Sequence, residues 1–232
     1  MSATASRRRV ICVGHAALDR VYSVDSWPAG SGKIPAHRFE ESGGGMAANA
    51  AAAIARLGGD AIFWGPTGDD AIAAAIHAQL VADGVDTGYL RRFEGRTSSH
   101  SAVIVDQFGE RLVVGFRGSA LQVPGNWLPL REVSLARAVL ADVRWFDGAV
   151  EVLREARDSS VPAILDAEIA EHHVLDVLTG IADHVIFSER GLSSWTSERI
   201  EDGLRKVIGK GAQVAAVTRG AQGVTWMAAD DP

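Results

Sequence analysis

The stretch from Ser42 to Asp60 reads SGGGMAANAAAAIARLGGD, and it decides how the chain folds. Three consecutive glycines place a backbone almost free of side chains directly before an alanine-rich segment that strongly favours a helix. We predict this helix from about residue 47 to 57, ending at Gly58-Gly59, because glycine favours helix C-termini. The free amides at a helix N-terminus attract anionic or hydroxyl-rich groups, so the stretch predicts a ligand site.

Other interpretations of this stretch stay open. The glycines could serve only close packing of the helix. Gly43, Gly45 and Ala48 also match the dinucleotide pattern G-x-G-x-x-A, which suggests a nucleotide-dependent oxidoreductase. That pattern should follow a buried strand, whereas residues 37–41 alternate in polarity, so this hypothesis ranks last. Gly32-Lys33 is not a P-loop, because Ile34 stands where Ser or Thr is required.

The composition limits the function classes. A chain of 232 residues that is 47% hydrophobic can bury the core of one α/β domain with a small appendage. A net charge of -6 excludes a basic field for nucleic acid or anionic membranes. Cys12 is the single cysteine, so disulfides within the chain are excluded. No apolar stretch approaches the roughly 20 residues of a membrane span and no secretory signal is evident, so we expect a soluble cytoplasmic protein.

The second half of the chain alternates between strands and helices. We predict strands near 139–141, 163–166, 185–187 and 214–218, with helices near 150–158, 174–181 and 200–208. Apolar strands separated by amphipathic helices predict a parallel sheet covered on both faces. Polar residues follow the strands and mark one functional edge: Asp142, Arg144, Asp147, Asp166, Ser188 and Thr218.

The first half of the chain has a different pattern. A buried strand is predicted at 10–14, and Asp19 follows it closely enough to accept hydrogen bonds from a ligand at the strand's carboxyl end. Residues 21–24, 34–40, 87–92, 98–106 and 110–117 then alternate in polarity, and we predict antiparallel excursions at 21–41 and 98–117. Phe108-Gly109 is predicted to be a hairpin turn, and Asp69-Asp70 is predicted to cap a helix that ends near residue 82.

Taken in order, these motifs resemble the ribokinase/PfkB family of carbohydrate kinases. The resemblance rests on Gly14 with Asp19, Gly43-Gly44-Gly45 with Asn49, Gly68-Asp69-Asp70, Gly109-Glu110-Arg111, Leu165-Asp166, and Val217-Thr218-Arg219-Gly220 with Gly223. It implies a doubly wound, mostly parallel α/β sheet over residues 8–232, with a small antiparallel lid whose strands lie at about 20–41 and 97–117. It also implies a homodimer formed through the lid.

The resemblance further implies an ATP-dependent kinase that uses Mg²⁺ and phosphorylates a sugar hydroxyl. The positions that match the substrate-binding residues of the family are Asp19, Gly44, Gly45, Asn49 and Asp166. The positions expected near the nucleotide are Ser188, Thr218, Gly220 and Gly223. Ser188 and Gly191 stand where the family usually has Asn and Glu, so no metal ligands are assigned.

Within the family, residues 31–33, 140–149 and 187–192 are similar to those of kinases that phosphorylate 6-deoxy-6-sulfofructose. This similarity implies that Lys33 and Arg144 bind a distal anionic group. A third sulfonate ligand of those kinases, an asparagine, is replaced here by Gly115, and Arg117 lies close enough in sequence to supply another donor. We therefore expect a ketose with an anionic far end, with a neutral fructose-like sugar as the main competitor.

One family motif is missing. The Gly-Ala-Gly-Asp segment, which supplies the anion hole and the catalytic base, does not occur before Pro232. We therefore expect no catalytic base within these residues and place it beyond Pro232. Two alternatives follow: the sequence is part of a longer kinase, or the protein is a catalytically inactive sugar-binding or nucleotide-binding protein on the same fold.

Overall fold

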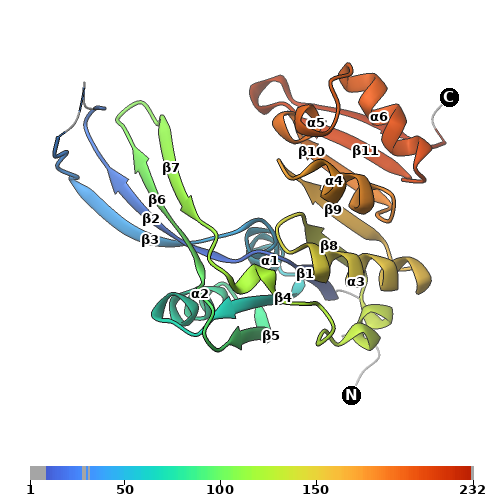
Figure 1. Ribbon diagram of the computed structural model, residues 1–232, viewed down its shortest axis with the longest axis horizontal. Helices are drawn as coiled ribbons and strands as arrows, with labels where there is room; N and C mark the ends of the chain where they lie inside the picture. Colours follow the sequence, from blue (N-terminus) through green and yellow to red (C-terminus); the bar gives the residue numbers. More distant parts are fainter. Residues whose placement is uncertain (1–8, 28–29, 31, 231–232) are drawn as a thin grey trace.

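The computed structural model describes residues 9–27, 30 and 32–230, and their strands form two sheets (Figure 1). Residue 8, residues 28, 29 and 31 of the predicted lid, and residues 231–232 lie outside the described part. The larger sheet has 8 strands in the order β12-β11-β10-β9-β8-β1-β4-β5. Its strands are β1 (Arg9–Val13), β4 (Asp60–Gly68), β5 (Asp86–Phe93), β8 (Ala138–Asp142), β9 (Ala163–Ala167), β10 (His184–Ser188), β11 (Val214–Thr218) and β12 (Val224–Ala228).

Neighbouring strands of the larger sheet run parallel, except that β12 pairs antiparallel with β11. This confirms the mostly parallel α/β sheet. The alternating residues 87–92 belong to β5, which pairs parallel with β4. As the edge strand, β5 is largely exposed, so its sequence alternates although its partner is parallel.

Helices and apolar residues cover both faces of the larger sheet. The α-helices are α1 (Met46–Arg56), α2 (Ala71–Ala82), α3 (Phe146–Asp158), α4 (His172–Thr179), α5 (Glu189–Trp195) and α6 (Ile200–Gly209). The 3₁₀ turns are η2 (Ala120–Gln122), η3 (Leu130–Leu135) and η4 (Gly220–Gln222). Successive residues of β1 enter opposite cores: Ile11 and Val13 join the larger cluster, whereas Cys12 joins the one formed with α1 and α2. Cys12 is therefore a buried core residue of β1, as predicted.

The smaller sheet has 4 strands in the order β3-β2-β6-β7 and extends away from the larger sheet (Figure 1). Its strands are β2 (Ala17–Ser23), β3 (Arg38–Gly44), β6 (Ser99–Val105) and β7 (Arg111–Phe116). The β2–β3 and β6–β7 pairs are antiparallel, and Gly109 (φ 81°) lies in the predicted turn between β6 and β7. The β2–β6 pair is parallel, so it joins residues far apart in the chain.

The glycine stretch connects the two sheets. β3 ends at Gly44, and Gly45 adopts φ 96° directly before α1. The strand before these glycines thus belongs to the smaller sheet, and it does not form the compact parallel βαβ unit that a dinucleotide site requires. This placement removes the structural basis of the oxidoreductase hypothesis.

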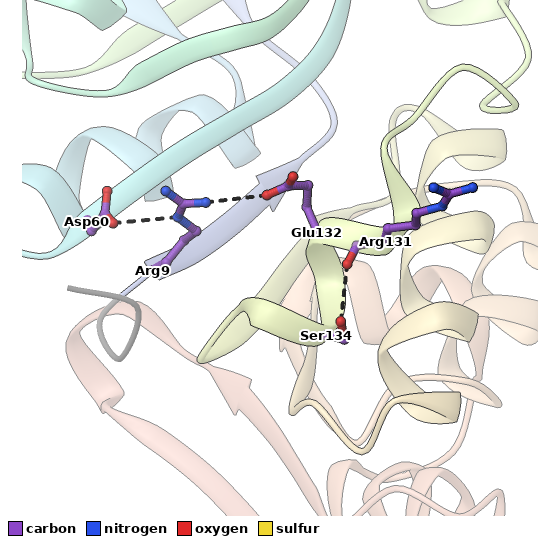
Figure 2. Close-up of polar contacts among 5 residues, drawn as sticks. All are labelled: Arg9, Asp60, Arg131, Glu132 and Ser134. Carbon is purple, nitrogen blue, oxygen red and sulfur yellow. Dashed lines mark hydrogen bonds and ion pairs between the residues drawn. The ribbon is translucent and has the colours of Figure 1, made fainter. Parts of the chain in front are cut away.

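At the amino ends of strands β1 and β4, Arg9 connects β1 with β4 and η3 (Figure 2). Its Nε lies 3.6 Å from Asp60 of β4, and its Nη1 lies 3.4 Å from Glu132 of η3. Ser134 Oγ donates a hydrogen bond to the Arg131 carbonyl within η3. Within the described residues, no helix has the length and apolar character needed to cross a membrane.

Candidate functional site

A cavity of about 370 Å³ lies where the smaller sheet meets the first strands of the larger one. Its walls come from β2, β6 and β7, from Gly45 before α1, and from the segment after β8. The lining residues are His15, Ala17, Asp19, Gly45, Ser99, His100, Ser101, Val113, Gly115, Phe116, Arg117 and Arg144. Segments more than a hundred residues apart in the chain thus share this cavity, which we call the inter-sheet cavity.

One side of the inter-sheet cavity carries hydrogen-bond acceptors. Asp19 lies within β2 rather than in the loop at the end of β1, which corrects its expected position. Ser101, its partner on the parallel strand β6, donates a hydrogen bond of 2.6 Å from Oγ to Asp19 Oδ1. A Cβ atom at the buried Gly44 would collide with the Asp19 carboxylate. The lack of a side chain at Gly44 therefore gives Asp19 its space.

The lining of the inter-sheet cavity also includes two cationic side chains, Arg117 and Arg144. Arg144 donates from Nη1 to the Ile169 carbonyl at 2.8 Å. Burial, followed by the positive charge of Arg117, lowers the pKa of Arg144, although Arg144 remains a cation at neutral pH. Gly115 also lines the cavity, and a Cβ atom there would meet nothing within 4 Å. Two guanidinium groups therefore stand beside open space, a combination suited to an anion.

His15 closes the cavity next to these charges. Burial lowers the pKa of His15, against the opposing effect of Asp142, so the imidazole is neutral at pH 7. Its Nε2 is buried and has no hydrogen-bond partner among the described residues. No sequence pattern marked His15, because a lone histidine after a strand has no distinctive spacing.

Four predicted substrate-binding residues are not part of the inter-sheet cavity lining: Lys33, Gly44, Asn49 and Asp166. Asn49 is exposed on α1 and lines a separate cavity of about 260 Å³ together with Ser42, Gly43 and Gly44. Lys33 is exposed in the segment between β2 and β3 and is not part of the inter-sheet cavity lining. The assignments of Asn49 and Lys33 as substrate ligands stay predictions.

Acidic residues lie at the carboxyl end of the neighbouring strand β9: Asp166 within it and Glu168 just after it. Asp166 is the register partner of Asp142 on β8. Burial, followed by the negative charges of Asp142 and Glu168, raises the pKa of Asp166 to about 6, while Arg144 opposes this rise. Glu168 Oε1 accepts a hydrogen bond of 2.8 Å from Ser188 Oγ. Ser188 also accepts from the Gly191 amide at the start of α5, so it links β9 to β10.

The residues expected near a nucleotide continue along this edge of the sheet. Thr218 is exposed at the end of β11, and its hydroxyl donates to the Phe187 carbonyl at 3.3 Å. Gly220 (φ 54°) and Gly223 (φ 82°) flank η4 in conformations that favour glycine. This open turn exposes backbone groups and suits a phosphate-bearing ligand. No cluster of three potential metal ligands occurs within the residues that the structure describes.

Sequence reasoning missed the serines of the inter-sheet cavity. Ser99 and Ser101 lie on β6, and the parallel β2–β6 pairing places them beside Ala17 and Asp19 of β2. No local pattern indicates which strand of the first half pairs with which. Arg117, in contrast, could be found, because it follows an alternating strand near a position that the family resemblance marked.

Comparison with known proteins identifies the relationship. Residues 7–231 match the family model described as pfkB family carbohydrate kinase. An ATP-dependent ribose-1-phosphate kinase of Halopiger xanaduensis is 32% identical over 158 residues, which are 68% of this chain and 53% of that protein. A fructokinase of Vibrio alginolyticus is 28% identical over 204 residues, which are 78% of this chain and 64% of that protein.

A solved structure of a provisionally assigned ribokinase from Agrobacterium tumefaciens gives a TM-score of 0.91 at 37% identity, covering 97% of this chain and 74% of that one. The chain thus spans about half to two thirds of the length of the two relatives above. The match extends through both sheets and includes the residues around the inter-sheet cavity.

Proposed function

Because the chain belongs to the pfkB family of carbohydrate kinases, we propose that the whole protein transfers the γ-phosphate of ATP to the primary hydroxyl of a ketose with an anionic far end. One observation carries the proposal: Asp19 and the pair Arg117 and Arg144 line the same cavity. A carboxylate accepts hydrogen bonds from sugar hydroxyls, and guanidinium groups form charge-assisted bonds to phosphate or sulfonate.

Each wall of the inter-sheet cavity has a role in this proposal. Asp19, held by Ser101, orients the sugar hydroxyls, while Gly44 and Gly45 let the sugar approach the backbone. Arg117 and Arg144 fix the far end of the sugar. Thr218 and the η4 turn bind the nucleotide, and Mg²⁺ supplied with ATP neutralises phosphate charge when bound. Phosphoryl transfer depends mainly on positioning and charge stabilisation, which these residues provide for the sugar half of the reaction.

The substrate candidates share an anion placed away from a primary hydroxyl. 6-Deoxy-6-sulfofructose and a ketose 6-phosphate are the first candidates, because Arg117 can replace the donor that Gly115 lacks. Ribose 1-phosphate is the second, since the Halopiger relative is described as a ribose-1-phosphate kinase. Neutral fructose or ribose is the competitor, and a binding protein without turnover is the alternative function.

A binding and turnover panel tests the proposal. We would measure affinity by calorimetry and ADP release with fructose, fructose 6-phosphate, sulfofructose, ribose and ribose 1-phosphate. We expect an anionic sugar to bind at least about tenfold more tightly than its neutral counterpart, because hydrogen bonds to charged groups contribute about 1.5–3 kcal/mol. Arg144→Ala and Arg117→Ala should remove this preference, whereas Arg131→Ala, an exposed arginine in η3, should leave it unchanged.

Three outcomes would be informative against the proposal. Equal affinity for neutral and anionic sugars contradicts the anionic substrate. Binding without ADP release in the full-length protein favours the inactive binding protein. Lys33→Ala and Asn49→Ala test the two predicted ligands outside the inter-sheet cavity, and unchanged sugar affinity in both would remove them from the site.

The smaller sheet supports a homodimer as part of the same proposal. Leu112, Val114 and Phe116 alternate along β7, so they share one face of the sheet, and each is at least half exposed. Phe39 continues this apolar face on β3 with 54% exposure. A second copy of the smaller sheet would cover it. Light scattering should give a dimer for the wild type and a monomer for Val114→Lys; a monomeric wild type would contradict the proposal.

A further inference from the structure

Asp142, at the end of β8, is fully buried and binds three backbone amides from three different segments. Its Oδ2 accepts from the His15 amide at 2.8 Å and from the Ala47 amide, in the first turn of α1, at 3.0 Å. Its Oδ1 accepts from the Arg144 amide at 2.8 Å. His15, Arg144 and Gly45, which precedes α1, all line the inter-sheet cavity. One carboxylate therefore fixes three walls of the cavity.

In the part of the chain that the structure describes, backbone amides, and not a cationic side chain, are the partners of this carboxylate. Burying a charge costs free energy unless it is paired, and Asp142 forms no ion pair within the described residues. Backbone amides and the N-terminus of α1 carry its hydrogen bonds instead. The neighbouring Gly14 also has to remain without a side chain, because a Cβ atom there would lie 2.5 Å from the carboxylate. An apolar side chain here would leave the His15, Ala47 and Arg144 amides without this partner, so the carboxylate is what joins the three segments.

We propose that Asp142 is a positioning residue for substrate binding, which holds the Arg144 segment, the His15 segment and the start of α1 in register around the inter-sheet cavity. The proposal rests on the proposed function, because it assigns Arg144 to the anionic end of the sugar. Asp142 itself does not line the cavity and acts through the segments that it binds.

Oδ2 accepts two of the hydrogen bonds and Oδ1 accepts one. A substitution can therefore remove the bond to the Arg144 amide and keep the other two. In Asp142→Asn, the amide oxygen can take the place of Oδ2 and keep the bonds from His15 and Ala47. The NH₂ group then faces the Arg144 amide, and two donors repel each other. Asp142→Asn should therefore release the Arg144 segment alone, whereas Asp142→Ala should release all three segments.

The test combines amide hydrogen exchange by NMR with calorimetric binding of fructose 6-phosphate and fructose to the 232-residue chain. In Asp142→Asn we expect lost protection at Arg144, retained protection at His15 and Ala47, and about tenfold or more weaker binding of fructose 6-phosphate with fructose affinity unchanged. In an Arg144→Ala background, Asp142→Asn should not change the ratio of the two affinities further. Asp183→Asn is the matched control, since Asp183 Oδ2 accepts the Ala163 amide at 3.0 Å between β9 and β10.

Equal losses for both ligands in Asp142→Asn would overturn the proposal, as would an unchanged affinity ratio in a folded variant. Fast exchange of the Arg144, His15 and Ala47 amides in the wild type would overturn it even if no variant folds. A wild type that does not prefer fructose 6-phosphate over fructose contradicts the anionic substrate instead, and the exchange pattern of the variants then decides the positioning role separately.

Discussion

Replacing Asp166 with asparagine should stabilise the protein at neutral pH and have no effect in acid. The folded protein raises the pKa of Asp166 from 3.8 to about 6, so ionisation of this carboxyl opposes folding. Its contribution to stability is fully present below pH 3.8 and is lost as the pH rises through about 6. Asparagine is neutral at every pH and removes this loss.

The magnitude follows from the pKa change. At about 1.4 kcal/mol for each tenfold change in the ionisation constant, a pKa of about 6 in place of 3.8 corresponds to roughly 3 kcal/mol. Asp166 is half-buried, and solvent screening reduces this figure, so we expect a gain of about 1 to 3 kcal/mol in the free energy of unfolding. The Asp166 side chain forms no hydrogen bond within the described residues that the substitution would remove.

Urea denaturation followed by tryptophan fluorescence would measure the free energy of unfolding of wild type and Asp166→Asn from pH 4 to pH 8. The two curves should meet near pH 4 and separate through pH 6. Asp176→Asn should behave oppositely, because the hydrogen bond from Lys210 lowers the pKa of Asp176. A destabilised Asp166→Asn at pH 7.5, or an equal gain at pH 4 and pH 7.5, would refute the reasoning.

Three further substitutions test other parts of the fold, each by urea denaturation. Gly14→Ala should lower the free energy of unfolding by about 2 to 4 kcal/mol, because alanine is strained at φ 144° and its Cβ atom would collide with Asp142. A loss below about 1 kcal/mol would contradict the close approach of Gly14 and Asp142. Asp70→Asn should lower the free energy of unfolding by about 1 to 2 kcal/mol at pH 7, and by less as the pH falls below 3.8. The reason is that burial raises the pKa of Asp70, but the hydrogen bonds from Ser98 and Ala73 outweigh burial and lower it. A loss that does not depend on pH would argue against this. Arg9→Ala should cost less than about 1 kcal/mol and less still in high salt, as its ion pairs are partly exposed; a larger, salt-independent loss would be inconsistent with that exposure.

The larger sheet was predictable because its signals are local. The predicted strand at 214–218 coincides with β11, and the predicted helix at 200–208 ends one residue before α6 does. Asp70 caps α2 through the Ala73 amide, as its position before an alanine-rich segment indicated. The antiparallel edge strand β12 was missed, since half-exposed residues near a glycine turn give no clear periodicity.

The inter-sheet cavity was predictable only in part, because its geometry depends on non-local pairing. The glycine stretch and the family resemblance indicated Asp19, Gly45 and Arg144, and these three line the cavity. The side-chain partner Ser101 and the buried role of Asp142 depend on contacts across 82 and 127 residues of sequence. Local patterns carry no information about contacts of that range.

The sequence separation between Asp142 and the amides that it binds has a consequence for folding during synthesis on the ribosome. β1 is synthesised before both of its neighbours in the sheet, β4 and β8, and β8 follows it by more than a hundred residues. Until β8 is synthesised, one edge of β1 lacks its strand partner, and the His15 and Ala47 amides lack the Asp142 carboxylate that binds them in the folded protein. Contacts this distant slow folding, and open strand edges invite wrong pairing. The nascent chain should therefore be most prone to aggregation after β1 and β4 have emerged and while β8 is still inside the ribosome.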